Sequence, residues 1–276
     1  MHNITVYDHK IPALGFGTWK LSGADCVRAV GLALDIGYRH IDTAQVYENE
    51  SDVGTALQSS GVPRKDIFLT TKIWMDNVRD GDLQKSAEKS LKKLKTDYVD
   101  LLLLHWPVHD VPLQEQLAAL RAVQKSGQAK LIGVSNYTVA QMREAVEDLS
   151  APIVANQVEY HPFISQKSVL DYARKNGLVL TAYSPLARGK VNDVPLLQEL
   201  ARQYGKNPGQ IALRWLMQQD HVAAIPKAAS EQHIRDNFNI FDFVLNEAQM
   251  QAISDLARPD GRLVNPQWAP QWDKVA

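Results

Sequence analysis

The sequence has little of several features that would assign its class at once. Cys26 is the only cysteine among 276 residues, which excludes an intramolecular disulfide and a cysteine-based zinc site and suits a reducing compartment. The apolar run at residues 101–104 is far too short to span a bilayer. The mixed, charged first residues contain no apolar signal segment. We therefore expect a soluble, cytoplasmic protein.

An excess of charge of either sign is also missing. The formal net charge is -1, from 30 Lys and Arg against 31 Asp and Glu. No global field therefore favours nucleic acid or an anionic membrane, and an anionic ligand would have to be held by local groups. We expect a monomer with a small-molecule partner, and neither a nucleic-acid nor a membrane partner.

What the sequence does contain is a regular alternation of short apolar runs and amphipathic stretches. The runs are continuous and rich in Val, Ile, Leu and Tyr, which favours buried parallel strands over half-exposed ones. The expected strands are residues 13–17, 40–42, 67–72, 98–105, 131–135, 154–159, 179–183 and 223–226. The expected helices between and after them are residues 24–35, 50–59, 83–94, 113–125, 139–147, 166–175, 208–219 and 231–238.

The spacing of the strands predicts the fold class. Candidate strand ends at residues 42, 72, 105 and 135 are separated by 30, 33 and 30 residues, which is the length of a βα unit. Eight such units without a linker predict one domain over residues 1–276, an α/β protein of the (β/α)8 TIM-barrel type. Helical patterns at 195–204 and 246–256 add two extra helices, and the proline-containing tail from residue 258 predicts a short C-terminal loop over one face.

The alternative architecture is a doubly wound open sheet. Such sheets usually carry a G-x-G-x-x-G fingerprint after the first strand. Residues 15–20 read G-F-G-T-W-K and end in lysine instead of glycine. The barrel is the better prediction.

Four side chains suited to proton transfer follow neighbouring strands, namely Asp42, Tyr47, Lys72 and His105. In a barrel the carboxyl ends of the strands share one face, so these residues can converge. A free tyrosine has a pKa of about 10, and a neighbouring ammonium lowers that pKa and eases proton donation. A carboxylate would keep the ammonium charged, and a neutral histidine could position a carbonyl oxygen. Each residue alone is better explained as a loop, cap or core residue, but together they predict a proton-transfer site.

Long motifs around these residues resemble the aldo-keto reductase family. Residues 37–54 match its first signature, with D-x4-Y and E-x2-V-G intact, and residues 130–137, K-L-I-G-V-S-N-Y, match its second. With D-G-R-L-V-N-P at 260–266, the likeness covers essentially the whole chain and is strongest to bacterial 2,5-diketo-D-gluconate and methylglyoxal reductases. It implies an NAD(P)H-dependent oxidoreductase that reduces aldehydes and ketones to alcohols. Methylglyoxal, keto-sugar acids and aryl aldehydes are the candidate small carbonyl substrates.

The resemblance also implies a role for each site residue. Tyr47 is the general acid, Lys72 and Asp42 tune it, and His105 orients the carbonyl, while hydride comes from nicotinamide C4. Amide side chains can pair with a carboxamide and an aromatic face suits a planar ring. The implied cofactor-binding residues are Gly17, Thr18, Trp19, Asp42, Ser135, Asn136, Gln157, Tyr183, Ser184, Leu186, Arg188, Ile225, Lys227, Ser230, His233 and Asn237. The expected substrate-binding residues are Trp19, Trp74, His105 and Trp106, and no metal site is expected.

The adenosine end departs from the family pattern. Lys227 ends an I-P-K motif and suits a 2′-phosphate, but the next residue is Ala228 instead of Ser or Thr. The arginine expected six residues past the lysine is His233, and a neutral histidine cannot replace a bidentate arginine–phosphate contact. We therefore expect NADPH to bind through Lys227 and Ser230, with NADH unusually well tolerated. Arg235 is nearby and is an alternative phosphate-binding cation, although helical spacing would direct it elsewhere.

Two other functions fit a barrel of this kind. A nicotinamide-sensing subunit would bind cofactor with little turnover, but the complete catalytic set and the lack of an added interaction segment weigh against it. An isomerase or hydrolase of phosphate substrates would require a carboxylate base or a metal cluster at the strand ends. The sequence has no such cluster.

Overall fold

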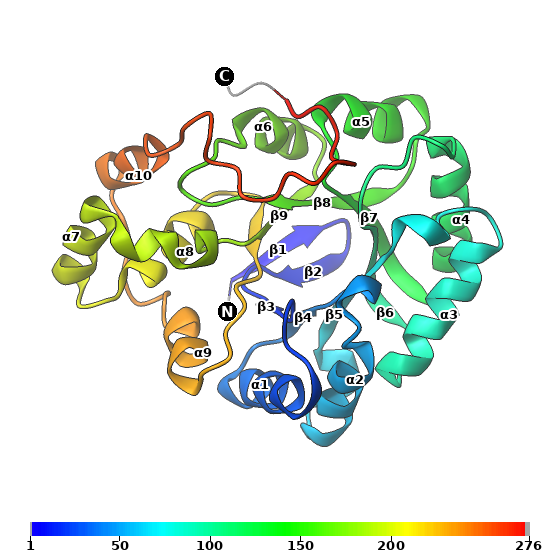
Figure 1. Cartoon of the computed structure of the whole chain (residues 1–276), viewed down its shortest axis with the longest axis horizontal. Helices are drawn as coiled ribbons and strands as arrows, with labels where there is room; N and C mark the ends of the chain where they lie inside the picture. Colours follow the sequence, from blue (N-terminus) through cyan, green and yellow to red (C-terminus); the bar gives the residue numbers. More distant parts are fainter. Residues whose placement is uncertain (1, 274–276) are drawn as a thin grey trace.

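A computed structural model of the chain describes residues 2–273. Eight parallel strands follow one another in chain order around a barrel, with the helices outside (Figure 1). Closure is made by the first and last strand segments, because Gly15 N–H and Gly17 N–H donate to Ala224 O and Pro226 O at 2.8 and 3.0 Å. The predicted (β/α)8 barrel is confirmed. The strands are β3 (Phe16–Gly17), β4 (His40–Asp42), β5 (Phe68–Ile73), β6 (Val99–Leu104), β7 (Ala129–Ser135), β8 (Ile153–Glu159), β9 (Val179–Tyr183) and β10 (Val222–Ala224).

The helices that surround the barrel agree closely with the amphipathic stretches of the sequence. Two of them, α7 and α10, are the predicted extra helices. The α-helices are α1 (Gly23–Ile36), α2 (Glu50–Ser59), α3 (Asp82–Leu94), α4 (Leu113–Lys125), α5 (Val139–Arg143), α6 (Lys167–Lys175), α7 (Pro195–Tyr204), α8 (Pro208–Met217), α9 (Glu231–Phe238) and α10 (Glu247–Ser254). Short 3-10 turns are η1 (Gln45–Tyr47), η2 (Arg64–Asp66), η3 (Met75–Asn77) and η5 (Ala187–Asp193), and η4 (Glu144–Asp148) is a π-helical turn.

A small antiparallel hairpin, which the sequence analysis did not predict, precedes the barrel. It consists of β1 (Asn3–Val6) and β2 (His9–Pro12). Ile4, Val6 and Ile11 are buried beneath it, so the hairpin covers one end of the barrel. Each strand has only four residues, which is too short for a clear alternation signal.

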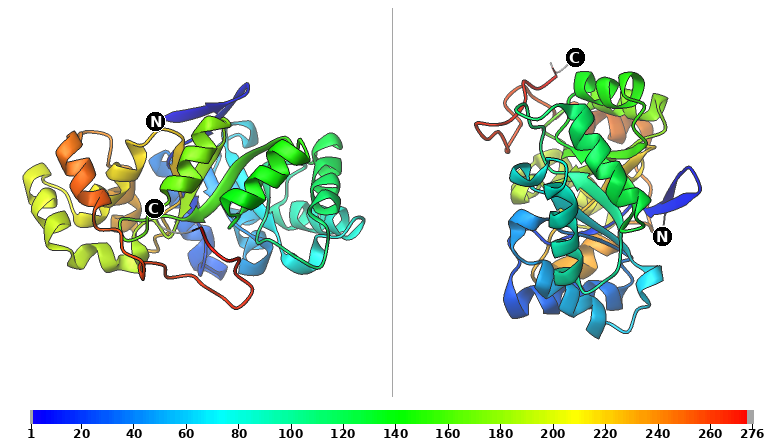
Figure 2. Two further views of the ribbon diagram at one scale, coloured as in Figure 1. Left: turned by 90° about the horizontal axis from the view of Figure 1, so that it is seen from above. Right: turned by 90° about the vertical axis from the view of Figure 1, so that its right-hand side faces the viewer.

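The opposite end of the barrel is where the strands finish and where the C-terminal tail lies. Figure 2 shows the hairpin and the tail on opposite sides of the molecule. All residues of β5, β6 and β8 are buried, so polar groups near their carboxyl ends are held by a rigid core. No helix within residues 2–273 has the length and apolar character needed to cross a membrane.

Candidate active site

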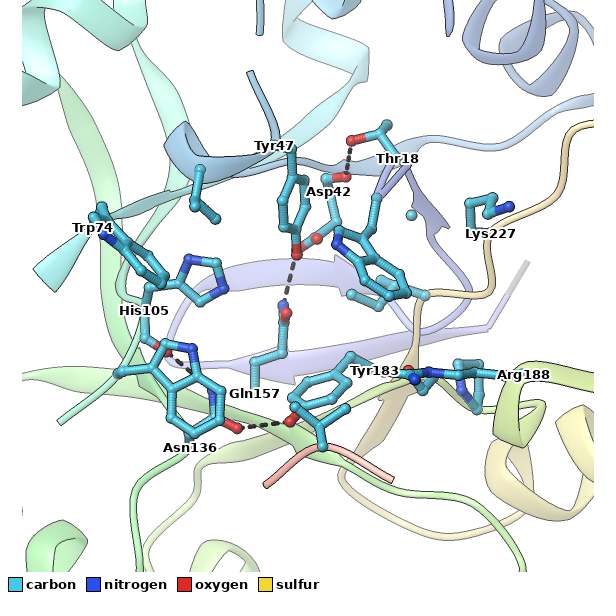
Figure 3. Close-up of a pocket in the computed structure, with 18 residues that line it drawn as sticks. Thr18, Asp42, Tyr47, Trp74, His105, Asn136, Gln157, Tyr183, Arg188 and Lys227 are labelled. Atoms are coloured by element: carbon cyan, nitrogen blue, oxygen red, sulfur yellow. Dashed lines mark hydrogen bonds between the residues drawn. The ribbon is translucent and has the colours of Figure 1, made fainter. Parts of the chain in front are cut away.

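An ion pair at the ends of two neighbouring strands anchors the site. Lys72, in β5, donates from Nζ to Asp42 Oδ1 at 2.6 Å, and neither side chain is more than 1% exposed. The same ammonium donates to Thr43 O at 2.8 Å and to Tyr47 Oη at 3.4 Å. Burial lowers the pKa of Lys72, while the adjacent Asp42 carboxylate opposes that shift. The contacts of Lys72 thus bring three of the four candidate catalytic residues together. Figure 3 shows two of these, Asp42 and Tyr47, beside the pocket with His105.

The pKa of Tyr47 moves in the direction opposite to the sequence-based expectation. Burial raises it well above its ordinary value, and the Asp42 carboxylate raises it further. The expectation counted only the ammonium of Lys72, whereas a hydroxyl buried beside a carboxylate strongly disfavours the phenolate. The side chain therefore keeps its proton throughout the neutral range. Lys72 can still stabilise the oxygen while that proton is leaving.

His105 follows β6 and faces the same space as Tyr47. Burial lowers the pKa of His105 well below its usual value, and Lys72 lowers it further, so the imidazole is neutral at neutral pH. Its ring meets the rings of Tyr47 and Trp74 edge-on, at centroid distances of 5.9 and 5.4 Å. In the tautomer with the proton on Nε2, it can donate a hydrogen bond to a carbonyl oxygen.

Two buried amides link this group to the next strands. Gln157 Nε2 donates to Asp42 Oδ2 at 2.8 Å. Asn136 Nδ2 donates to His105 O at 3.0 Å, and Tyr183 Oη donates to Asn136 Oδ1 at 2.9 Å. Asn136 has a φ of +64°, a backbone conformation that asparagine tolerates better than most residues. The amides therefore have fixed orientations.

These side chains surround a cavity of about 230 Å³ that continues into a groove of about 560 Å³. The cavity is lined by Gly17, Thr18, Trp19, Asp42, Val46, Tyr47, Trp74, His105, Trp106, Asn136, Gln157, Tyr183, Ser184, Pro185, Arg188, Ile225, Lys227 and Val264. Both spaces share Trp19, Ser184, Pro185, Arg188 and Lys227. The combined shape is elongated, with a catalytic end and an end beside α9.

Most of the residues predicted for the cofactor line this shape, but two do not. Leu186, His233 and Asn237 line the groove. Ser135 lies outside both spaces and donates from Oγ to Gln157 O at 2.7 Å. Ser230 also lies outside them, and its Oγ accepts from His233 N–H at 3.3 Å as the N-cap of α9. The structure gives these two serines supporting contacts without direct exposure to the groove.

Three residues that line the cavity were not predicted from the sequence. Val46 and Pro185 are sequence neighbours of the predicted Tyr47 and Ser184. Their positions in the sequence could therefore have indicated that they line the cavity. Val264 comes from the C-terminal tail, and no spacing rule could direct it here. The tail also brings Trp268 against Trp74, with ring centroids 6.2 Å apart.

The groove end near α9 has a distinctive charge arrangement. Arg235 turns away from the groove and pairs with Glu231 at 2.8 Å on the exposed face of the helix. Asp236 lines the groove beside His233, and its carboxylate accepts from Asn207 Nδ2 at 3.2 Å. Arg235 therefore does not replace the arginine that is missing at position 233. Within residues 2–273, no group of three or more His, Cys, Asp or Glu side chains is arranged to hold a metal ion.

Comparisons with known proteins agree with the fold and the motifs. The model of the aldo/keto reductase family matches residues 13–258. The chain is 40% identical to methylglyoxal reductase DkgB of Yersinia pestis over 267 residues, which are 95% of this chain and 99% of that protein. It is 37% identical to glyoxal reductase of Bacillus subtilis over 258 residues, 93% of each protein.

The structural comparison leads to the same class. A crystal structure provisionally named 2,5-diketo-D-gluconic acid reductase B matches with a TM-score of 0.97 and 51% identity, covering 99% of this chain and 98% of that one. The chain belongs to the aldo/keto reductase family. Its likeness to the bacterial methylglyoxal and diketogluconate reductases, inferred from the motifs, is confirmed.

Proposed function

We propose that the protein is a nicotinamide-dependent carbonyl reductase that converts aldehydes and ketones to alcohols. The observation that carries the proposal is the contact of Lys72 Nζ with both Asp42 Oδ1 and Tyr47 Oη, at 2.6 and 3.4 Å, beside the neutral His105. The names of the relatives, methylglyoxal reductase and glyoxal reductase, support small dicarbonyl compounds as substrates.

The groove is suited to an extended nicotinamide dinucleotide. In the wall of the adjoining cavity the chain approaches itself closely, since a Cβ on Gly17 would lie 2.6 Å from Ile225 O. Arg188 and Lys227 line both the cavity and the groove and supply cations where the two join. Cations at this place can bind the phosphate groups of a dinucleotide. Asn136 and Gln157 offer amides at the catalytic end, where the bound cofactor would supply a hydride.

The chain itself supplies the proton. Tyr47 Oη donates it to the carbonyl oxygen, and the Lys72 ammonium stabilises the charge that develops on Oη. Asp42 holds that ammonium in place through the 2.6 Å contact. His105 Nε2–H donates a hydrogen bond to the same carbonyl oxygen and so orients it.

Loss of reduced-cofactor absorbance at neutral pH tests the proposal. NADPH and NADH would each be mixed with methylglyoxal, glyoxal, an aryl aldehyde and a keto-sugar acid. We expect carbonyl-dependent oxidation with at least one of them. Tight cofactor binding without any such oxidation would instead favour a nicotinamide-sensing protein.

We also infer that NADPH is the cofactor and that NADH is used unusually well. Three features of α9 support this inference: the His233 imidazole in the groove at the position of the expected arginine, the Arg235–Glu231 ion pair outside the groove, and the Asp236 carboxylate in the groove lining. Lys227 remains available for a phosphate ester on the adenosine ribose, but position 233 offers an imidazole instead of the bidentate guanidinium of an arginine.

Replacing His233 with arginine is expected to lower the Kd for NADPH roughly tenfold, because a charge-assisted hydrogen bond contributes about 1.5–3 kcal/mol before ordering costs. The Kd for NADH should change less than twofold. Quenching of tryptophan fluorescence by each cofactor measures both constants. Arg235→Ala, which removes the guanidinium outside the groove, is the control and should leave both unchanged. NADPH preference of several orders of magnitude in the parent, unaltered by His233→Arg, would contradict the inference.

A further inference from the structure

The C-terminal tail crosses the mouth of the barrel and contributes to the catalytic cavity. It appears as the red segment over the strand ends in Figures 1 and 2. Val264, within this tail, lines the cavity together with Tyr47 and Trp106. The shape of the substrate end of the cavity therefore depends on where the tail is held.

One buried carboxylate, that of Glu159, holds the C-terminal tail in this position. Glu159 is the last residue of β8 and is 0% exposed. Its Oε1 accepts from Leu263 N–H at 2.7 Å, and its Oε2 accepts from Val264 N–H at 2.8 Å. Backbone N–H groups of two successive tail residues are thus bound by the two oxygens of a single side chain.

A third donor fixes the carboxylate itself. His161 Nε2 lies 2.8 Å from Glu159 Oε1, and Phe163 N–H donates to His161 Nδ1 at 3.3 Å. Because Nδ1 is an acceptor, the ring proton is on Nε2 and is donated to Glu159. The imidazole is wholly buried, so the carboxylate has one stable orientation.

The loop after β8 also fixes the start of the tail. Arg258 N–H donates to Phe163 O at 3.1 Å, and the guanidinium lies 5.2 Å from the centre of the Phe163 ring. At Gly261 a Cβ would stand 1.7 Å from Phe163 O, so no side chain fits there. Only glycine, which has no Cβ, therefore permits the tail to approach this loop so closely.

We infer that Glu159 is a positioning residue that sets the affinity for the carbonyl substrate by fixing Val264 in the cavity wall. The inference rests on the proposed reductase activity. Glu159 is absent from the lining of the cavity and of the groove, so it acts through the tail and should affect the substrate more than the cofactor.

Glu159→Gln keeps the size of the side chain but replaces one accepting oxygen with an NH2 group, which cannot accept from a tail N–H. In the intact chain we expect the amides of Leu263 and Val264 to exchange hydrogen at least tenfold faster. The KM for methylglyoxal should rise roughly tenfold, with kcat within about threefold and the Kd for NADPH unchanged. Glu159→Asp keeps both carboxylate oxygens. Its tail exchange and its KM should therefore lie between those of Glu159→Gln and the parent.

Gly261→Ala perturbs the same contact from the tail side and should reproduce the pattern without altering Glu159. Asp100→Asn is the matched control, because Asp100 is also a buried carboxylate but pairs with Arg64 of η2 and Lys130 of β7, at 2.8 and 2.9 Å, and not with the tail. This variant should change the free energy of unfolding only, with KM and tail exchange as in the parent.

Two results would overturn the inference. One is unchanged tail exchange and KM in folded Glu159→Gln and Gly261→Ala; the other is an equal rise in substrate KM and cofactor Kd. Absence of carbonyl-dependent oxidation in the parent would instead refute the proposed function, and the exchange measurement would still report whether Glu159 holds the tail.

Discussion

Tyr47→Phe is expected to lower kcat for carbonyl reduction by about 10²–10⁴-fold, which is the usual contribution of a positioned general acid. The substitution removes only the hydroxyl that lies 3.4 Å from Lys72 Nζ. The ring can keep its edge contact with His105, so the fold and the cavity should persist. Steady-state rates with saturating NADPH and a saturating aldehyde measure the effect.

The chain offers a matched control for this variant. Tyr137 is also a buried tyrosine, and its hydroxyl has no hydrogen-bond partner within the described residues. Tyr137→Phe also removes one buried tyrosine hydroxyl, but no hydrogen bond is lost with it. This variant should therefore keep kcat within about twofold of the parent value. Full activity in Tyr47→Phe would refute the proposed proton donor, whatever the control shows.

Lys72→Met should have the largest effect on stability as well as removing most activity. It leaves the Asp42 carboxylate buried without its ion pair, and breaking a buried pair in this way costs about 3–5 kcal/mol. Gln157 Nε2, at 2.8 Å, would be a remaining donor to that carboxylate. Urea unfolding measures the loss, and kcat should fall at least 10²-fold because the developing charge on Tyr47 is no longer stabilised.

The double variant Asp42→Asn with Lys72→Met separates the two effects. It removes the unpaired charge, so at least half of the lost unfolding free energy should return while kcat stays low. If Lys72→Met alone is as stable as the parent, the ion pair contributes nothing to the folded state and the electrostatic argument fails.

The barrel was predictable because its signals repeat. Eight buried apolar runs with regular spacing indicate parallel strands, and Asp42, Lys72 and His105 follow from the rule that strand ends share one face. The hairpin at residues 3–12 was not predictable, because strands of four residues have too few alternating positions to be recognised.

The convergence of the candidate residues at the strand ends was predictable, but the energetics of the cluster were not. The raised pKa of Tyr47 depends on burial, which is a property of the packed mouth and not of spacing. Val264 enters the cavity through a tail that has no helix or strand between residues 258 and 273, so its place follows from the three-dimensional contacts of Glu159 and not from a sequence pattern. The histidine at position 233 and the direction of Arg235 away from the groove both followed from the sequence, but the partner of Arg235, Glu231, needed the structure.

The closure of the barrel has a consequence for how the protein folds. Gly17 and Lys227 lie on opposite sides of the seam where the first and last strands meet, and both line the catalytic cavity. Contacts between such distant parts of a chain form late, since the intervening loop must first be ordered. The wall of the cavity is therefore complete only when the last strand has paired with the first, and a ligand bound in the cavity would report a completely assembled barrel.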